Sequence, residues 1–398
     1  MKIAMLGSRG VPATFGGVER HVEELGRRLA VRGHEVTVYA ESKYLGDDPV
    51  REHLGMRVVR VPTLPVAGLE AIAHSAMSTV AAMTGGYDVL HYHAVGPGLL
   101  APLPRYLSNA RVVQTIHGLD GERAKWGRVA QTILNAATWM SARVPDETIT
   151  VSSALADHYL ERYGRTCSTI VNGVTPKMPR PASLIRTKYG LGGGDYYLFV
   201  GRLVPEKRPD LLIKAFGELD TDARLVIAGG SSYTDDYVAE LRRLAARDDR
   251  VIMPGYIYGE ELDELYTNAR ALVQPSALEG LPLTLLEAMG SGTPVIASDI
   301  APHLEVIGGS RPGARLFADG DLHSLVEALQ FVDKDPVAEL RAAAFDAPYI
   351  ARKFDWDVAV DRLEAVYAGL SVGTPLRALE TPRAASSLGF TIEKETAA

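Results

Sequence analysis

Cysteine is almost absent from this sequence. Cys167 is the single cysteine in 398 residues, so an intramolecular disulfide is impossible. A small secreted domain held together by cross-links is therefore excluded, and a reducing compartment fits best. Because no neighbouring residue in the sequence activates Cys167 as a nucleophile, we expect a buried or neutral thiol.

Long apolar runs and an excess of positive charge are also lacking. The nearest approach to a membrane span, residues 66–83, is interrupted by Glu70 and His74, and a spanning helix needs about 20 apolar residues. The net charge of −7 argues against a general nucleic-acid-binding surface. The first residues do not have the pattern of a signal peptide. We expect a cytoplasmic protein, with peripheral contact at the inner membrane face left open.

The composition that is present, 46% hydrophobic and 23% charged, is typical of a globular protein. A chain of 398 residues exceeds one ordinary core, so two domains are expected. Short apolar runs alternate with amphipathic stretches, which predicts parallel α/β sheets. The expected strands form two series, 2–6, 35–40, 56–61, 88–93, 111–117 and 147–152, then 196–201, 225–228, 251–254, 271–274 and 294–297.

A segment rich in proline and glycine, residues 176–194, separates the two series of strands. It predicts a domain boundary. The predicted parts are an N-terminal domain of residues 1–180, a C-terminal domain of 181–352, a helix over 353–372 and a tail over 373–398. Ligands bind outside the carboxyl ends of strands in such sheets, so the cleft between the two domains is the expected site.

Two glutamates, Glu279 and Glu287, stand seven residues apart in an apolar stretch punctuated by glycine and proline. Pro282 suits the first turn of a helix and Gly290 suits its end, so Glu279 should precede the helix and Glu287 should lie within it. A helix start attracts anions, and carboxylates beside it can accept hydrogen bonds from sugar or ribose hydroxyls. Two carboxylates could equally serve glycoside hydrolysis.

Arg202 and Lys207 follow the expected strand 196–201 and precede a helix expected near Pro209. Arginine offers a planar fork of donors to phosphate oxygens, and lysine offers a mobile point charge. A solvated basic turn is the alternative interpretation. The position at the carboxyl end of a strand favours phosphate binding.

The other candidate residues lie in the N-terminal half. Gly16 and Gly17 follow the first strand, where glycines let backbone amides approach a phosphate, although an ordinary turn explains them equally well. His93 and His117 each end an expected strand and should point into the cleft. A histidine there could orient a sugar or share a proton. For His117 this role and a purely structural one are evenly balanced.

No convincing metal site is expected. His91 and His93 face the same side of a strand, but a pair of histidines with one cysteine in the chain is a weak ligand set. The pattern Asp-x-Asp, which binds metal diphosphates in other transferases, occurs four times and is therefore unspecific.

Residues 121–143 combine basic residues with Trp126 and Trp139 in an amphipathic pattern. Such a helix suits a membrane interface, because indoles and cations both favour the headgroup region. An ordinary domain helix with a solvated face explains the same pattern and is slightly favoured.

Together these segments resemble the retaining glycosyltransferases of family 4, whose GT-B fold has two facing Rossmann-like, doubly wound α/β domains with an interdomain cleft. The most specific element is Glu279–Glu287, the Glu-x7-Glu motif of that family. Residues 201–207 and the segment 170–174 near the interdomain crossover are the next two, although Thr175 stands where many members carry aspartate. Residues 8–19 are similar to a bacterial subgroup of rhamnosyl and polysaccharide-building enzymes.

The resemblance implies a role for each candidate residue. Arg202 and Lys207 would bind the donor diphosphate and stabilise the leaving group. Glu279 would hold the transferred sugar, Glu287 the ribose, and His117 would approach the sugar. The remaining positions implied are Gly16 and Gly17 at the diphosphate, Gly280 and Leu281 beside Glu279, Gly255 and Tyr256 near the base, and Phe354–Trp356 at the start of a helix that returns to the first domain.

The implied activity is retaining transfer of a sugar, of hexosyltransferase type, from a nucleoside diphosphate sugar to a glycan or lipid-linked acceptor. The resemblance places it in bacterial polysaccharide or cell-envelope glycan synthesis, with no cofactor and no metal. A nucleotide-sugar epimerase of GT-B fold and a catalytically silent nucleotide-sugar-binding protein are the alternatives. The combination of Arg202, Lys207, Glu279 and Glu287 argues against the silent protein.

Overall fold

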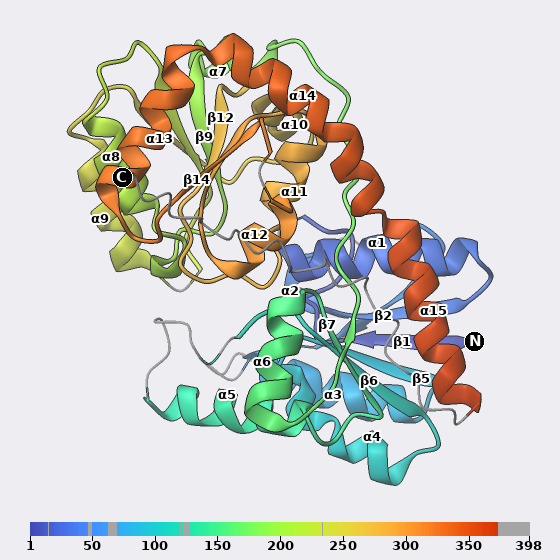
Figure 1. Cartoon of the computed structure of the whole chain (residues 1–398). Helices are drawn as coiled ribbons and strands as arrows, with labels where there is room; N and C mark the ends of the chain where they lie inside the picture. Colours follow the sequence, from blue (N-terminus) through green and yellow to red (C-terminus); the bar gives the residue numbers. More distant parts are fainter. Residues whose placement is uncertain are drawn as a thin grey trace, which may run out of the picture.

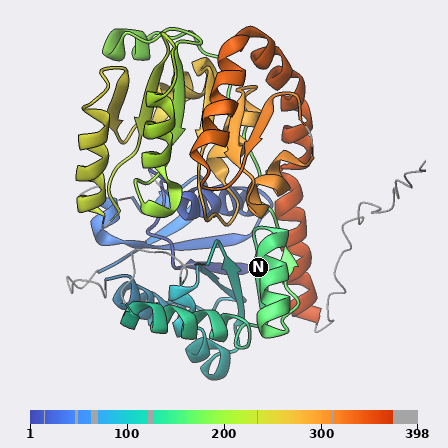
Figure 2. The same cartoon turned by 60° about the vertical axis from the view of Figure 1, so that its left-hand side comes forward.

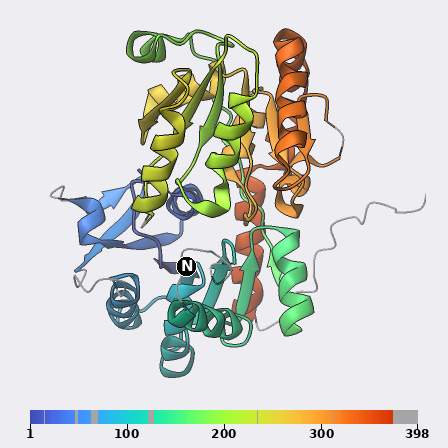
Figure 3. The same cartoon turned by 90° about the vertical axis from the view of Figure 1, so that its left-hand side faces the viewer.

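The protein is built around two sheets of mainly parallel strands, each flanked by helices (Figure 1). The computed structural model describes residues 1–14, 16–46, 50–62, 70–119, 121, 128–232, 234–309 and 311–372. Turned views show the two α/β units as separate lobes stacked on one another (Figures 2 and 3). The expected fold of two doubly wound α/β domains is confirmed.

The first domain contains an eight-stranded sheet of order β3-β4-β2-β1-β5-β6-β7-β8. Its strands are β1 Lys2–Leu6, β2 Glu35–Glu41, β3 Glu52–His53, β4 Met56–Val61, β5 Val89–His93, β6 Arg111–Ile116, β7 Glu147–Thr150 and β8 Ser168–Thr169. Only the short pair β3–β4 is antiparallel among these described strands. The helices are α1 Gly17–Val31, α2 Ser42–Leu45, α3 Glu70–Met83, α4 Pro102–Leu107, α5 Arg128–Ser141 and α6 Ser153–Tyr163.

The second domain contains a six-stranded parallel sheet of order β11-β10-β9-β12-β13-β14. Its strands are β9 Tyr196–Val200, β10 Arg224–Ala228, β11 Val251–Gly255, β12 Ala271–Gln274, β13 Val295–Ser298 and β14 Ala314–Phe317. The helices are α7 Leu184–Tyr189, α8 Pro209–Gly217, α9 Asp235–Ala245, α10 Gly259–Asn268, α11 Leu283–Gly290, α12 Ala301–Ile307, α13 Leu322–Lys334 and α14 Pro336–Lys353. Since β9 and β12 are neighbours although distant in sequence, the loops that follow them start side by side.

Helix α15, Trp356–Val372, leaves the second domain and packs against α1 of the first (Figure 1). Trp356, Val360 and Leu363 are buried in the core that also holds the inner face of α1. The return crossing runs beside the outgoing one, because the Val174 amide donates to the Phe354 carbonyl at 2.8 Å. A Cβ on Gly173 would lie 2.5 Å from the Trp356 ring, so only glycine fits between the two crossings.

All eleven expected strands are present, with end positions that shift by one or two residues. Three strands were missed, β3, β8 and β14, because two to four residues are too few to show a periodic pattern. The helix between the two glutamates is also confirmed, with one correction. Pro282 is the residue before α11 rather than part of its first turn, and its backbone is extended.

Other expectations concern the surface and the thiol. None of the helices in the described ranges is both long and apolar enough to cross a membrane. Trp126 and the tail over 373–398 lie outside the described residues, whereas Trp139 on α5 is 50% exposed. Burial raises the pKa of Cys167 to about 12, which confirms a neutral thiol.

Candidate active site

A buried ion pair joins the loops that follow β9 and β12. Lys207 ends the short 3-10 helix Pro205–Lys207 after β9, and Glu279 lies between β12 and α11. The Lys207 Nζ is 2.6 Å from the Glu279 Oε1, and the two side chains are only 13% and 12% exposed. The two sequence candidates that stand 72 positions apart are therefore one structural unit.

The Glu279 carboxylate is held by further donors. The Gln274 amide and the Ser276 hydroxyl each donate to Oε1 at 2.8 Å. Burial alone would raise the pKa of Glu279, but the charges of Lys207 and His303 and these hydrogen bonds outweigh it and lower the pKa to about 2. Glu279 is therefore ionised at neutral pH and can only accept hydrogen bonds, as a ligand for hydroxyl groups would.

His303 on α12 lies behind this pair and was not singled out from the sequence. Its Nδ1 lies 2.9 Å from the Ser298 carbonyl, and its side chain is fully buried. Burial lowers the pKa of His303 below the usual range, and the Lys207 charge adds to that effect against the opposing Glu279 charge. Because His303 lies in a short apolar helix, its sequence context does not indicate which side chains it meets in the folded protein.

Arginines from both domains act on the same two groups, the buried Glu19 and the exposed Tyr256. The Arg9 backbone N–H donates to the Glu19 carboxylate at 3.1 Å. Burial raises the pKa of Glu19, and the charges of Arg9 and Arg202 oppose that rise. The same two guanidinium groups oppose the burial that raises the pKa of Tyr256. Arg9 of the first domain and Arg202 of the second thus converge where the domains meet, a pairing that the sequence did not reveal.

Gly280 and Gly17 lie where the two domains approach each other closely. A Cβ on Gly280 would lie 1.9 Å from the His117 carbonyl oxygen, and a Cβ on Gly17 would lie 3.5 Å from the Leu283 side chain at the start of α11. Gly16, at φ 101°, could carry no Cβ without meeting the Glu19 carboxylate at 2.0 Å. The structure therefore brings His117 and the N-terminal glycine loop against the Glu279 loop and α11.

Four imidazoles lie together at the strand ends of the first domain, from His21, His91, His93 and His117. The His93 Nδ1 is 3.4 Å from the His117 Nε2, and the ring centroids of His21 and His117 are 4.6 Å apart. Both His93 and His117 are expected to point into the cleft; the His93 side chain is fully buried against the His21 and His117 rings, whereas His117 is partly exposed. Burial lowers the pKa of His21 to about 4 and that of His91 to about 3, so both are neutral at pH 7.

His21 is the member of this group that sequence reasoning missed. It lies on the buried face of α1, four residues before Leu25. Its Nδ1 is 2.6 Å from the Asn172 carboxamide oxygen, in the segment that crosses to the second domain. No residue next to His21 in the sequence identifies these partners.

The remaining candidates lie around the second domain's site. Glu287 is on the second turn of α11, where its charge adds to burial in raising the pKa of Tyr266. Leu281 is 6% exposed and packs in the domain core, so it supports the loop from behind rather than lining an open surface. Gly255 has a φ of 85°, and Tyr256 donates to the Ser231 carbonyl at 2.8 Å while stacking on Tyr258.

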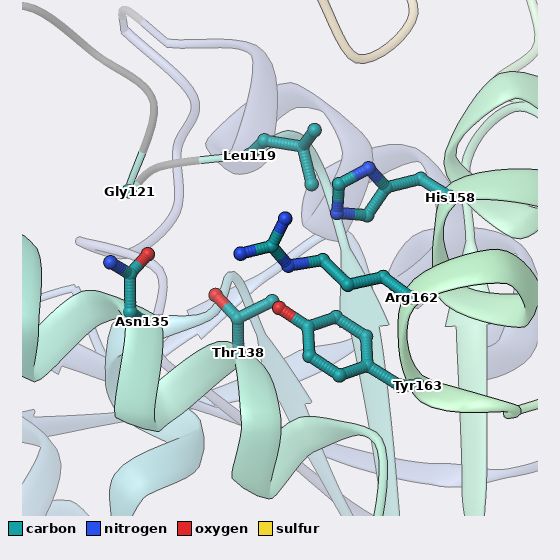
Figure 4. Close-up of a pocket in the computed structure, with 7 residues that line it drawn as sticks. All are labelled: Leu119, Gly121, Asn135, Thr138, His158, Arg162 and Tyr163. Carbon is teal, nitrogen blue, oxygen red and sulfur yellow. The ribbon is translucent and has the colours of Figure 1, made fainter.

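A hollow lies in the first domain, between α5 and α6 (Figure 4). Its volume is about 200 Å³. The Arg162 guanidinium points into it, opposite the side chains of Asn135 and Thr138 (Figure 4). Leu119, two residues after His117, lines the hollow and also packs against the apolar cluster that combines Val151 and Leu155 with core residues of the second domain. The complete lining is Leu119, Gly121, Asn135, Thr138, His158, Arg162 and Tyr163.

Comparison with known proteins identifies the two domains separately. Residues 15–177 match the family model described as Glycosyltransferase Family 4, and residues 183–346 match that of Glycosyl transferases group 1. The D-inositol 3-phosphate glycosyltransferase of Corynebacterium diphtheriae is 28% identical, over 92% of this chain and 94% of its own. The glycogen synthase of Mycobacterium tuberculosis is 28% identical, over 94% and 96%. The solved sucrose-phosphate synthase of Thermosynechococcus elongatus has a TM-score of 0.80 at 24% identity, covering 94% of this chain and 100% of that one.

Proposed function

This chain belongs to the family 4 glycosyltransferases of GT-B fold, and from that membership we propose that it moves a sugar from a nucleoside diphosphate sugar to a glycan or lipid-linked acceptor. The observation that carries the proposal is the buried pair of Lys207 and Glu279 at the tips of adjacent strands. One partner suits a phosphate and the other suits sugar hydroxyls, and a nucleotide-sugar carries both groups side by side.

Lys207 and Arg202 are the proposed leaving-group stabilisers. Breaking the anomeric C–O bond develops negative charge on the diphosphate, and fixed cations in a site shielded from water stabilise that charge strongly. Arg9, which acts on the same groups as Arg202, would add a cation from the first domain. The N-terminus of α11 would supply backbone N–H groups to the same oxygens. With these charges in place, we propose that transfer needs no divalent metal.

Glu279 is proposed as a ligand of the transferred sugar rather than as a nucleophile. Its Oε1 already accepts from Lys207, Gln274 and Ser276, and its low pKa rules out donating a proton near neutral pH. We propose that the acceptor attacks from the face that the diphosphate leaves, with retention of configuration. His117, whose carbonyl oxygen abuts Gly280, would reach the same sugar.

The hollow between α5 and α6 is our proposed acceptor subsite (Figure 4). Leu119, two residues after His117, lines this hollow. The hollow also presents the Asn135 amide, the Thr138 hydroxyl and the Arg162 guanidinium, which suit a polyhydroxylated or anionic acceptor. We further propose that the acceptor belongs to a bacterial polysaccharide or envelope glycan. The reaction would then take place in the cytoplasm, at the inner membrane face where the acceptor is lipid-linked.

The test is incubation of the purified chain with a panel of UDP, dTDP, GDP and ADP sugars, each with and without candidate acceptors. Mass spectrometry and NMR then identify the products. We expect release of the nucleoside diphosphate and a glycoside with the donor's anomeric configuration, both dependent on the acceptor. An isomerised nucleotide-sugar formed without acceptor would identify an epimerase, and binding without turnover would identify a silent protein.

A further inference from the structure

Three histidines from distant parts of the first domain converge on one point. His21 comes from α1, His93 ends β5, and His117 follows β6. One ring nitrogen of each lies within 4.8 Å of the other two. The His93 Nδ1 and the His117 Nε2 are 3.4 Å apart, which is roughly the separation of two nitrogens bound at about 2.0–2.1 Å to one tetrahedral ion.

The His21 ring is oriented as metal-binding histidines usually are. Its Nδ1 lies 2.6 Å from the Asn172 Oδ1, and an amide oxygen only accepts, so the proton is on Nδ1. The Nε2 lone pair of the neutral ring is then free. The His21 Nε2 is buried, in a side chain that is only 2% exposed, and it has no hydrogen-bond partner among the described residues. A metal ligand typically donates its other ring N–H to such a carbonyl, which fixes the tautomer.

His93 presents its Nδ1 to His117, so its Nε2 would carry the proton when an ion binds. That Nε2 is buried without a hydrogen-bond partner in the described part of the chain. His91 is an internal contrast, because its Nδ1 lies 2.7 Å from the Tyr367 hydroxyl and its Nε2 lies 2.7 Å from the Thr115 hydroxyl. Both ring nitrogens of His91 therefore have protein partners, whereas His21 and His93 each have one ring nitrogen without a partner among the described residues.

We propose that His21, His93 and His117 bind one divalent transition-metal ion of the zinc type. Neutral imidazole suits Zn²⁺, Cu²⁺ and Ni²⁺, and three protein ligands leave a fourth position for a small ligand. Because His21 and His93 are buried and His117 is partly exposed, that position faces the junction with the second domain. Asn172 is the positioning residue, since it holds the His21 proton away from the ion.

Metal binding has a consequence for transfer that rests on the proposed function. His117 is the group that we assign to the donor sugar, and the ion would occupy its Nε2, the nitrogen that lies 3.4 Å from the His93 Nδ1. The bound ion therefore withdraws His117 from the sugar and inhibits the reaction. The site would be an inhibitory one, compatible with transfer that needs no metal.

The binding test uses full-length, tag-free protein stripped with a chelator and dialysed. Co²⁺ is titrated and followed by its visible absorption, and Zn²⁺ is titrated by calorimetry. We expect one ion per chain and a strong absorption band typical of tetrahedral Co²⁺. His21→Gln and His93→Gln should each weaken binding at least 100-fold, and Asn172→Ala 10- to 100-fold. The surface variant His323→Gln is the matched control and should bind as the wild type does.

Circular dichroism and thermal melting establish which variants fold, and the glutamine substitutions keep much of the histidine volume. Absence of a stoichiometric ion on the folded wild type would overturn the proposal, as would equal affinity in folded His21→Gln and His93→Gln. In a transfer assay, the Zn²⁺ concentration for half inhibition should rise at least tenfold in His21→Gln, relative to its own metal-free rate. If no transfer is found, the Co²⁺ titration still decides the metal site separately.

Discussion

The site has one half in each domain, and the buried polar side chains of the two halves differ in charge. In the second domain, Lys207 and Glu279 stay charged and neutralise each other at 2.6 Å. In the first domain, His21 and His93 are neutral, and each has a ring nitrogen without a partner among the described residues. Both groups lie at the carboxyl ends of parallel strands, so the fold provides the place and the residue types decide the electrostatics.

The physical cost explains the difference. A buried ammonium or carboxylate is tolerated only with a partner, and removing one partner leaves an uncompensated charge. An imidazole avoids that cost by losing its proton, which is why burial lowers the pKa of His21 to about 4. The charged half suits an anionic diphosphate, and the neutral half suits hydroxyl groups or a metal ion.

The largest expected effect on catalysis comes from removing the Lys207 charge from the second domain's half of the site. Lys207→Ala should lower kcat/KM about 10³-fold, or about 4 kcal/mol, because the leaving diphosphate loses a fixed cation. Steady-state kinetics with the donor found in the panel measures this. The control is Lys214→Ala, whose exposed Nζ lies 3.1 Å from Asp210, and it should change kcat/KM less than twofold. Full activity in Lys207→Ala would remove the functional contrast between the halves.

The free energy of unfolding should depend on pH through the Glu279 carboxylate. The pKa of Glu279 is lowered from its ordinary 4.5 to about 2, so the ionised carboxylate stabilises the fold above about pH 4.5. That contribution, about 3 kcal/mol at neutral pH, is lost as the pH falls toward 2. The gap in melting temperature between wild type and Glu279→Gln should be largest at pH 7 and narrower at pH 3.5. A constant gap would contradict a carboxylate held by Lys207.

The contact between the halves is tested at Gly280. A Cβ there would lie 1.9 Å from the His117 carbonyl oxygen, which is backbone and cannot swing aside. Gly280→Ala should therefore shift the loop of Glu279 and lower kcat/KM about 10²-fold, since misplacement by about 1 Å has effects of that size. Gly217→Ala, with no atom within 4 Å of the added Cβ, is the control. Equal rates in both variants would separate the two halves functionally.

Loss of the neutral half should cost less. His117→Ala removes one hydrogen bond from a neutral group to the sugar, worth about 1.4 kcal/mol, or about tenfold in kcat/KM. Initial rates at low donor concentration measure it, with His323→Ala as the control. A loss as large as that of Lys207→Ala would mean that the imidazole carries charge in the transition state.

The smallest expected effect is that of a chelator. Transfer should be no slower in EDTA, because Lys207, Arg202 and Arg9 supply the positive charge, and removal of an ion from the three histidines would only raise the rate. Rates are compared before and after chelator treatment of tag-free protein. Activity that disappears in EDTA and returns only with Mg²⁺ or Mn²⁺ would show that these cations are insufficient.

Local pattern sufficed for much of the second domain's half. The loop of Glu279, the helix that carries Glu287 and the strand before Arg202 each follow from a few consecutive residues, since proline, glycine and apolar runs act over short distances. The error at Pro282 is a shift of one position at a helix end, where capping geometry rather than pattern decides.

The first domain's half could not be found in this way. His21 is on the inner face of α1, Asn172 is 151 positions away, and the sequence around Arg9 does not indicate that it meets the same groups as Arg202. The position of His93 at a strand end indicated its direction but not that its ring would be fully buried. The His21 ring of α1 packs edge-on against it, with 5.4 Å between the ring centroids.

The sequence by itself determined two α/β domains, a neutral thiol, the loop-and-helix setting of the two glutamates and a basic turn at a strand tip. Each of these features follows from residues within about ten positions of one another in the sequence, so composition and periodicity are enough to predict it. Only the tertiary structure decided that Lys207 pairs with Glu279, that Arg9 joins Arg202, and that three histidines share one point. These relations depend on strand order and on the crossing of α15, because the folded chain brings together side chains that no local pattern connects.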